Sequence, residues 1–69
     1  MTEEQFERDY PKDRYRYERT SYRTKGPMQE TEIETFDIIS IETGETVLQP
    51  TRTEHTQQRG LITTVNWDW

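Results

Sequence analysis

The sequence predicts a mainly β protein, a four-stranded antiparallel meander in the form of an open sheet or small barrel, with a short N-terminal helix or arm. Among its 69 residues there are twelve threonines and no alanine, a composition that suits strands better than helices. The segment 60–68 alternates apolar and polar residues as a half-buried strand does. Glycines at 26, 44 and 60 separate four such segments.

Length and composition predict a single domain, with residues 1–12 as the arm or helix and residues 13–69 as the sheet. A chain this short buries only about 60% of its unfolded surface. No cysteine is present to form a disulfide or a thiolate metal site. We therefore expect a homo-oligomer or a place in a larger assembly. The candidate core residues are Phe6, Met28, Ile33, Phe36, Ile38, Ile39, Ile41, Val47, Leu48, Leu61, Ile62, Val65, Trp67 and Trp69.

The N-terminal segment has a helix start signal. Thr2 is followed three residues later by Gln5, which is the spacing of a capping box. Pro11 disfavours helix at and before its own position, so a helix over residues 3–9 is expected, with Phe6 and Tyr10 as its anchors. Such a short helix needs docking to persist, and a frayed terminus is the alternative.

The expected strands cover residues 14–24, 30–42, 45–55 and 60–68. Gly26 and Gly44 are expected at positive φ in the first two turns, and residues 57–60 form the third. In the last strand one face carries Leu61, Thr63, Val65, Trp67 and Trp69. The segment 30–42 alternates less regularly, so either both of its faces are partly covered or a bulge near residues 36–38 shifts its phase.

Charge is distributed unevenly along the chain. Residues 8–25 carry a net charge of +4, whereas residues 26–51 carry six acidic and no basic side chains. These acids are Glu30, Glu32, Glu34, Asp37, Glu42 and Glu45. If Gly26 and Pro27 are the central turn residues, Arg23 faces Glu30 and Arg19 faces Glu34. Such exposed pairs contribute only about 0–1 kcal/mol each but help to specify strand register.

The same six carboxylates also form a candidate partner-binding surface. Alternate residues of a strand lie roughly 6.6–6.8 Å apart, about the advance of one nucleic-acid strand over two phosphates. In size, charge and composition the chain resembles small acidic inhibitors of phages and mobile elements. The predicted function is therefore a non-enzymatic inhibitor or adaptor that occupies a basic, normally nucleic-acid-binding surface of a partner protein, mimicking DNA.

Two alternative functions follow from other residues. Trp67 and Trp69 are candidate interface anchors, because tryptophan is enriched at binding hot spots. They could serve a partner, or a second copy if the protein is a structural subunit of a larger assembly. The segment 14–23 interleaves arginines with tyrosines, a pattern that can stack bases and contact phosphates of a nucleic-acid single strand.

No catalytic or cofactor motif is recognisable. His55 is the only histidine, which leaves a zinc site without its usual ligands. Ser21 and Ser40 lie in no nucleophile motif, and no phosphate-binding glycine motif occurs. We expect no enzymatic activity, cofactor, metal or small-molecule substrate. No apolar run reaches the length of a membrane span, so a cytoplasmic protein is expected.

Overall fold

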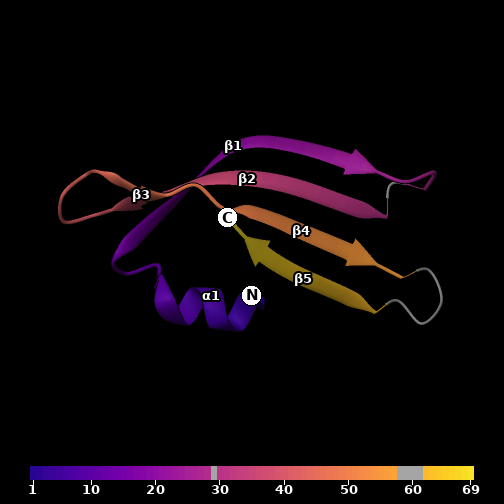
Figure 1. Cartoon of the computed structure of the whole chain (residues 1–69), viewed down its shortest axis with the longest axis horizontal. Helices are drawn as coiled ribbons and strands as arrows, with labels where there is room; N and C mark the ends of the chain where they lie inside the picture. The colour runs from indigo at the N-terminus through magenta and orange to yellow at the C-terminus, as the bar shows by residue number, and fades with distance from the viewer. Residues whose placement is uncertain (29, 58–61) are drawn as a thin grey trace.

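The computed structural model describes residues 1–28, 30–57 and 62–69. These residues form one helix, α1 (Glu3–Asp9), and the strands β1 (Tyr15–Lys25), β2 (Thr31–Ser40), β3 (Thr46–Leu48), β4 (Thr51–Thr56) and β5 (Thr63–Asp68). All strand pairs are antiparallel, and the sheet order is β1-β2-β4-β5, with β3 on the second half of β2. The mainly β prediction with a short N-terminal helix is confirmed, and the sheet is open (Figure 1).

The strand expected over residues 45–55 is two strands, β3 and β4. They are separated by Gln49 and Pro50, and a proline has no N–H to donate to a neighbouring strand. The Pro50 carbonyl still accepts a bond of 3.1 Å from the Phe36 amide. The interruption lets β2 change partners along its length, from β3 near Ile38 to β4 near Thr35.

Helix α1 begins as the sequence predicts. The Thr2 hydroxyl accepts from the Gln5 amide and the Gln5 side chain accepts from the Thr2 amide, both at 3.2 Å. Met1 fastens the segment to β5, because its carbonyl accepts from the Trp67 amide at 2.7 Å and its amino group donates to the Trp67 carbonyl at 3.0 Å. The helix is therefore docked rather than frayed.

The core lies between α1 and one face of the sheet. Phe6 stacks on Trp67 with ring centroids 4.1 Å apart and planes 4° from parallel. Ile38 completes this cluster beneath them, and Tyr17 meets the Phe6 ring edge-on. The core prediction is wrong for several described candidates that lie exposed: Met28, Ile41, Val47, Ile62 and Trp69. A single seven-residue helix is too short to cover a sheet of this length.

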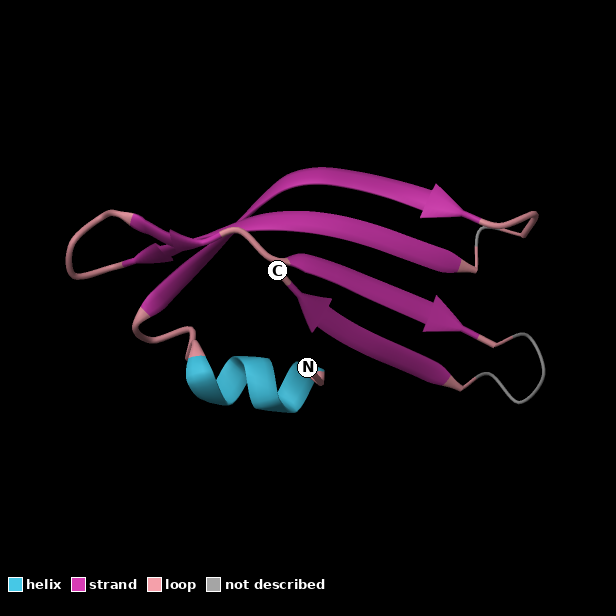
Figure 2. Ribbon diagram, viewed as in Figure 1, coloured by secondary structure: helices cyan, strands magenta, loops and turns pink. Residues whose placement is uncertain are grey.

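The molecule is elongated, with extents of 43 × 21 × 17 Å. Its radius of gyration is 13.4 Å, compared with about 11 Å for a compact chain of this length. Its accessible surface is 5175 Å², compared with roughly 4,600 Å² for a compact monomer of this mass. Figure 2 shows why: α1 lies at the end of the sheet where β1 begins and β5 ends, and no described element lies beside the other end.

The β1–β2 register differs from the prediction. Tyr17 pairs with Ile38, Arg19 with Phe36 and Arg23 with Ile33, so the Arg23–Glu30 alignment is wrong. The connection is longer than a two-residue turn, because β1 ends at Lys25 and β2 begins at Thr31. The β1–β2 register also shifts between Arg19 and Ser21 on β1. The β2–β3 register shifts between Ile38 and Ile39, at the end of the stretch where the sequence offered a bulge. The expected positive φ angles are confirmed, at 99° for Gly26 and 76° for Gly44.

Tyr17 gives this fold a predicted sensitivity to alkali. Its hydroxyl donates to the Tyr10 carbonyl at 2.5 Å. Burial, followed by the charges of Glu7 and Glu3, raises its pKa from 10.0 to about 12. The folded state thus holds the neutral phenol more strongly than the unfolded chain does. The stability from this group is complete below pH 10 and is lost as pH rises through about 12.

Denaturant unfolding at pH 10 and pH 12 measures this effect. The wild-type protein should lose free energy of unfolding over that interval, and Tyr17→Phe, which cannot ionise there, should lose less. Tyr17→Phe should also be less stable near neutral pH by about 1 kcal/mol, because it lacks the hydroxyl hydrogen bond. Equal losses in the two proteins between pH 10 and 12 would assign the alkaline transition to other groups.

Candidate partner-binding site

The register divides the sheet into two faces. Even-numbered residues of β2, including Glu32 and Glu34, lie on the face that α1 partly covers, which we call the helix face. Odd-numbered residues, including Ile33 and Asp37, lie on the opposite face, which we call the open face. The six predicted partner-binding acids are therefore not one row: two lie on the helix face, one on the open face, and the others in the turns.

Glu34 is neutralised within the chain. Its carboxylate accepts from Arg52 at 3.0 Å and from Arg19 at 3.3 Å. The Arg19–Glu34 contact forms diagonally across the sheet, since Arg19 lies opposite Phe36. Only 13% of the Glu34 side chain is exposed. This carboxylate is thus part of the folded structure and offers little charge to a partner.

Arg52 is the centre of this ionic network. Besides Glu34, it contacts Glu3 of α1 and Glu54 of β4, each at 3.0 Å. Burial by itself lowers the pKa of Arg52, but hydrogen bonds to Glu54 and Glu3 outweigh it, and the net pKa is raised. The sequence shows Arg52 as the only base that an adjacent third strand could offer to the acidic segment, but it does not show that Glu3, Glu34 and Glu54 converge on this guanidinium.

Three further predicted acids also have partners within the chain. Glu30 accepts from the Met28 amide at 3.1 Å and holds the β1–β2 turn. Glu32 accepts from the Tyr22 hydroxyl at 2.7 Å, a hydrogen bond that, ahead of desolvation, raises the pKa of Tyr22. Asp37 accepts from the Gln49 side chain at 3.1 Å. The first contact is local to the β1–β2 connection, the second links β1 to β2, and the third links β2 to the β3–β4 connection.

The remaining two acids, Glu42 and Glu45, lie in the hairpin between β2 and β3. This hairpin closes through bonds from the Gly44 amide to the Ser40 carbonyl at 2.7 Å and from the Ser40 amide to the Glu45 carbonyl at 2.9 Å. It extends beyond the rest of the sheet (Figure 1, left). Neither carboxylate has a hydrogen-bond or ion-pair partner in the part of the chain that the structure describes.

Apolar side chains flank these two carboxylates. Ile41 is 59% exposed and Val47 is 48% exposed. Large exposed aliphatic side chains beside solvated charges are typical of a surface that contacts another protein. A hairpin that positions both types together is therefore a better candidate contact surface than the neutralised carboxylates of β2.

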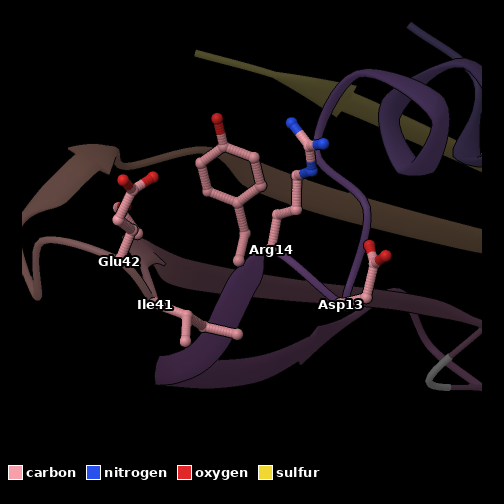
Figure 3. A pocket seen from close by; sticks show the side chains of 6 residues that line it. Asp13, Arg14, Ile41 and Glu42 are labelled. Carbon is pink, nitrogen blue, oxygen red and sulfur yellow. The ribbon is translucent and has the colours of Figure 1, made fainter.

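A hollow of about 460 Å³ lies beside the hairpin, lined by Asp13, Arg14, Tyr15, Ser40, Ile41 and Glu42. Figure 3 shows Ile41 and Glu42 on one side of it and Arg14 and Asp13 on the other. The Ile41 amide donates to the Arg14 carbonyl at 3.0 Å, which joins the α1–β1 turn to the hairpin. We call this region the hairpin end and define it by Asp13, Arg14, Ile41, Glu42, Glu45 and Val47.

The two tryptophans have different environments. Trp67 is 2% exposed, and its indole N–H donates to Glu3 at 3.0 Å, so it lies in the core of the single chain. Trp69 is 59% exposed and touches Phe6 only edge-on, with centroids 5.7 Å apart. Of the two predicted interface anchors, the folded chain presents Trp69 on its surface.

The Arg/Tyr segment does not form one surface. Tyr15 packs on Tyr10 and Tyr17 on Phe6, both on the helix face. Arg16 and Arg23 pair with odd-numbered residues of β2 and so lie on the open face. The strand alternation therefore separates the stacking rings from two of the cations that a single-strand binder would need beside them.

The hairpin end is the part of the site that sequence reasoning missed as a unit, since Asp13 and Arg14 meet Ile41 and Glu42 only in the folded chain.

Among the described residues, no group of three or more His, Asp or Glu side chains is placed to hold a metal ion. Among the residues that the structure describes, no helix is long and apolar enough to cross a membrane. Comparison with protein-family models, curated proteins and solved structures finds no match.

Proposed function

We propose that this protein is a non-enzymatic adaptor or inhibitor that binds a basic partner protein through its hairpin end. The proposal depends on one observation: exposed Glu42 and Glu45, without ion-pair partners among the described residues, lie beside exposed Ile41 and Val47. Charge complementarity of this kind steers association, and the apolar side chains supply area that is removed from water.

A surface that normally binds nucleic acid is the first class of partner to test, because such surfaces concentrate lysine and arginine. The regular pitch of Glu30, Glu32 and Glu34 lends this idea less support than the hairpin end does, because Glu34 is already paired with Arg19 and Arg52. The contact is expected to be local and mixed, with carboxylates around an aliphatic centre, rather than a long imitation of a phosphate backbone.

A role as a structural subunit is a second candidate function. It is favoured by the large surface of the chain and by the half of the sheet that no other described element covers (Figure 2). The two functions use different surfaces and are compatible with each other.

Affinity capture tests the hairpin end. The immobilised protein is incubated with nuclease-treated lysate of its source cell, and bound proteins are eluted with salt. The double variant Glu42→Gln/Glu45→Gln is compared with Glu4→Gln/Asp68→Asn, which removes the same charge from exposed positions elsewhere. A basic protein should be captured by the wild-type and control chains, and its purified form should bind the hairpin variant on the order of tenfold more weakly.

Two results would contradict the proposal. Equal weakening in both double variants would show that binding follows net charge and not the hairpin end. Undiminished binding to the hairpin variant would place the contact elsewhere on the molecule.

A further inference from the structure

No described element of the chain covers the open face of the sheet, because α1 packs on the helix face. Following the register, its centre carries Thr31, Ile33 and Thr35 of β2 beside Thr51 and Thr53 of β4. These side chains are β-branched, neutral and only partly exposed. A sheet normally buries at least one face along its length against another layer, and residues 1–28, 30–57 and 62–69 supply no second layer here.

The charges on the open face are concentrated on β1. Lys25 lies opposite Thr31, at the turn end of the strand, and Arg23 lies opposite Ile33. Glu18 lies opposite Asp37, towards the other end. Arg16, opposite Ile39, lies beyond Glu18 and pairs with it at 3.2 Å, so Arg16, Glu18 and Asp37 together carry one net negative charge. The β1 edge of this face therefore has a basic end, at Lys25 and Arg23, and a net acidic cluster about three rows of side chains away.

A second copy of the chain complements this arrangement. Consider two copies stacked open face to open face and related by a twofold axis that lies between the two sheets, at right angles to the strands. The axis passes midway between the row of side chains that contains Ile33 and the row that contains Thr35. Lys25 of each copy then faces Glu18 of the other, and Ile33 faces Thr35. Arg23 faces Ser21, so no pair of like charges meets. A twofold axis along the strands would instead place Lys25 above Thr64 on β5 and lose these contacts.

The distances permit the contacts. Stacked sheets lie about 10 Å apart, a gap that a lysine and a glutamate side chain extending from opposite sheets can bridge. Four strands of six residues present a surface of roughly 19 by 20 Å on each copy. That is about half the area each partner contributes to a stable interface of standard size. The expected association is therefore weak and depends on concentration.

We propose that two copies of this chain associate open face to open face as a twofold-symmetric β-sandwich, with α1 on the outside and Lys25–Glu18 pairs between the copies. The surface is distinct from the hairpin end, so this inference does not rest on the proposed function. In this arrangement the two hairpin ends point in opposite directions beyond the overlap. The dimer would then present two partner-binding ends.

Sedimentation equilibrium over a range of protein concentrations, with charge-swap variants, tests the pairing. Lys25→Glu and Glu18→Lys should each weaken dimerisation on the order of tenfold, because like charges then face each other. The double variant Lys25→Glu/Glu18→Lys should restore it. Lys12→Glu, which makes the same change of charge in the exposed α1–β1 turn, is the matched control and should leave dimerisation unchanged.

Methyl NMR identifies the face. On raising the concentration of the wild-type protein, the Ile33 methyl signals should shift, whereas those of Val65 on the helix face should not. A monomer at every concentration would overturn the proposal. A dimer that the double variant fails to restore, or whose shifts concentrate on Ile41 and Val47 of the hairpin end, would also overturn it.

Discussion

Replacing Trp67 with alanine is expected to destabilise the protein by about 3–5 kcal/mol, the usual loss for a buried aromatic side chain. Trp67 is 2% exposed, stacks on Phe6 and donates a hydrogen bond to Glu3. A domain of this length has a total stability of roughly 3–10 kcal/mol. The variant should therefore be largely unfolded, or unfold at much lower denaturant, when followed by circular dichroism.

Trp69→Ala is the matched control for this prediction. It removes the same side chain two residues later in the chain, from a position that is 59% exposed. Surface substitutions of this kind change stability by about 0.5 kcal/mol or less. If the two variants were equally stable, the stacked Phe6–Trp67 pair would not be what holds α1 on the sheet.

Replacing Arg52 with methionine is expected to cost about 2–3 kcal/mol. The change keeps the apolar stem but leaves the carboxylates of Glu3, Glu34 and Glu54 near one another without their shared cation. Breaking a fully buried network costs about 3–5 kcal/mol. The smaller value is expected here because 19% of the Arg52 side chain and 35% of the Glu3 side chain reach solvent.

Two variants check that the loss comes from the network. Arg16→Met breaks an ion pair with Glu18 whose side chains are 63% and 52% exposed, and it should cost no more than about 0.5 kcal/mol. Arg52→Met/Glu54→Gln should recover part of the loss, because Glu54 has no other ion-pair partner among the described residues, whereas Glu34 keeps Arg19. Urea unfolding of the wild-type protein and the three variants measures the free energy of unfolding of each. An equal loss of stability in Arg16→Met and Arg52→Met would contradict the central role of Arg52.

Local signals in the sequence were sufficient for much of the fold. Thr2 and Gln5 predicted the start of α1, because a capping box is satisfied within four residues of chain. Gly26 and Gly44 predicted the first two turns, because few other residues adopt positive φ without strain. The alternation around Trp67 predicted β5 and its buried side. Each of these inferences needed only neighbouring residues.

The candidate site was less predictable, because residues distant in the sequence decide whether a carboxylate is paired or free. The sequence shows the six acids of residues 26–51, but not that Arg52 reaches both Glu34 and Glu3, since these three residues belong to different elements. The bulge at Thr20 was equally hidden, and it changed which residues of β1 and β2 are opposite each other. Before the bulge the predicted register is wrong by two residues, which keeps each side chain on its face but changes its partner. After the bulge it is wrong by three residues, which also changes which residues of β1 and β2 share a face.

The sequence by itself therefore determined the β class of this protein, its N-terminal helix and its acidic central segment, because propensity, capping and turn chemistry act over a few residues. The tertiary structure decided which charges are neutralised and which remain available, because that depends on the register and on the docking of α1. It neutralised Glu34 at the centre of the sheet and left Glu42 and Glu45 at the hairpin end, beside exposed Ile41 and Val47. Among the described residues it also left the open face without a covering layer, because the one helix packs on the opposite face.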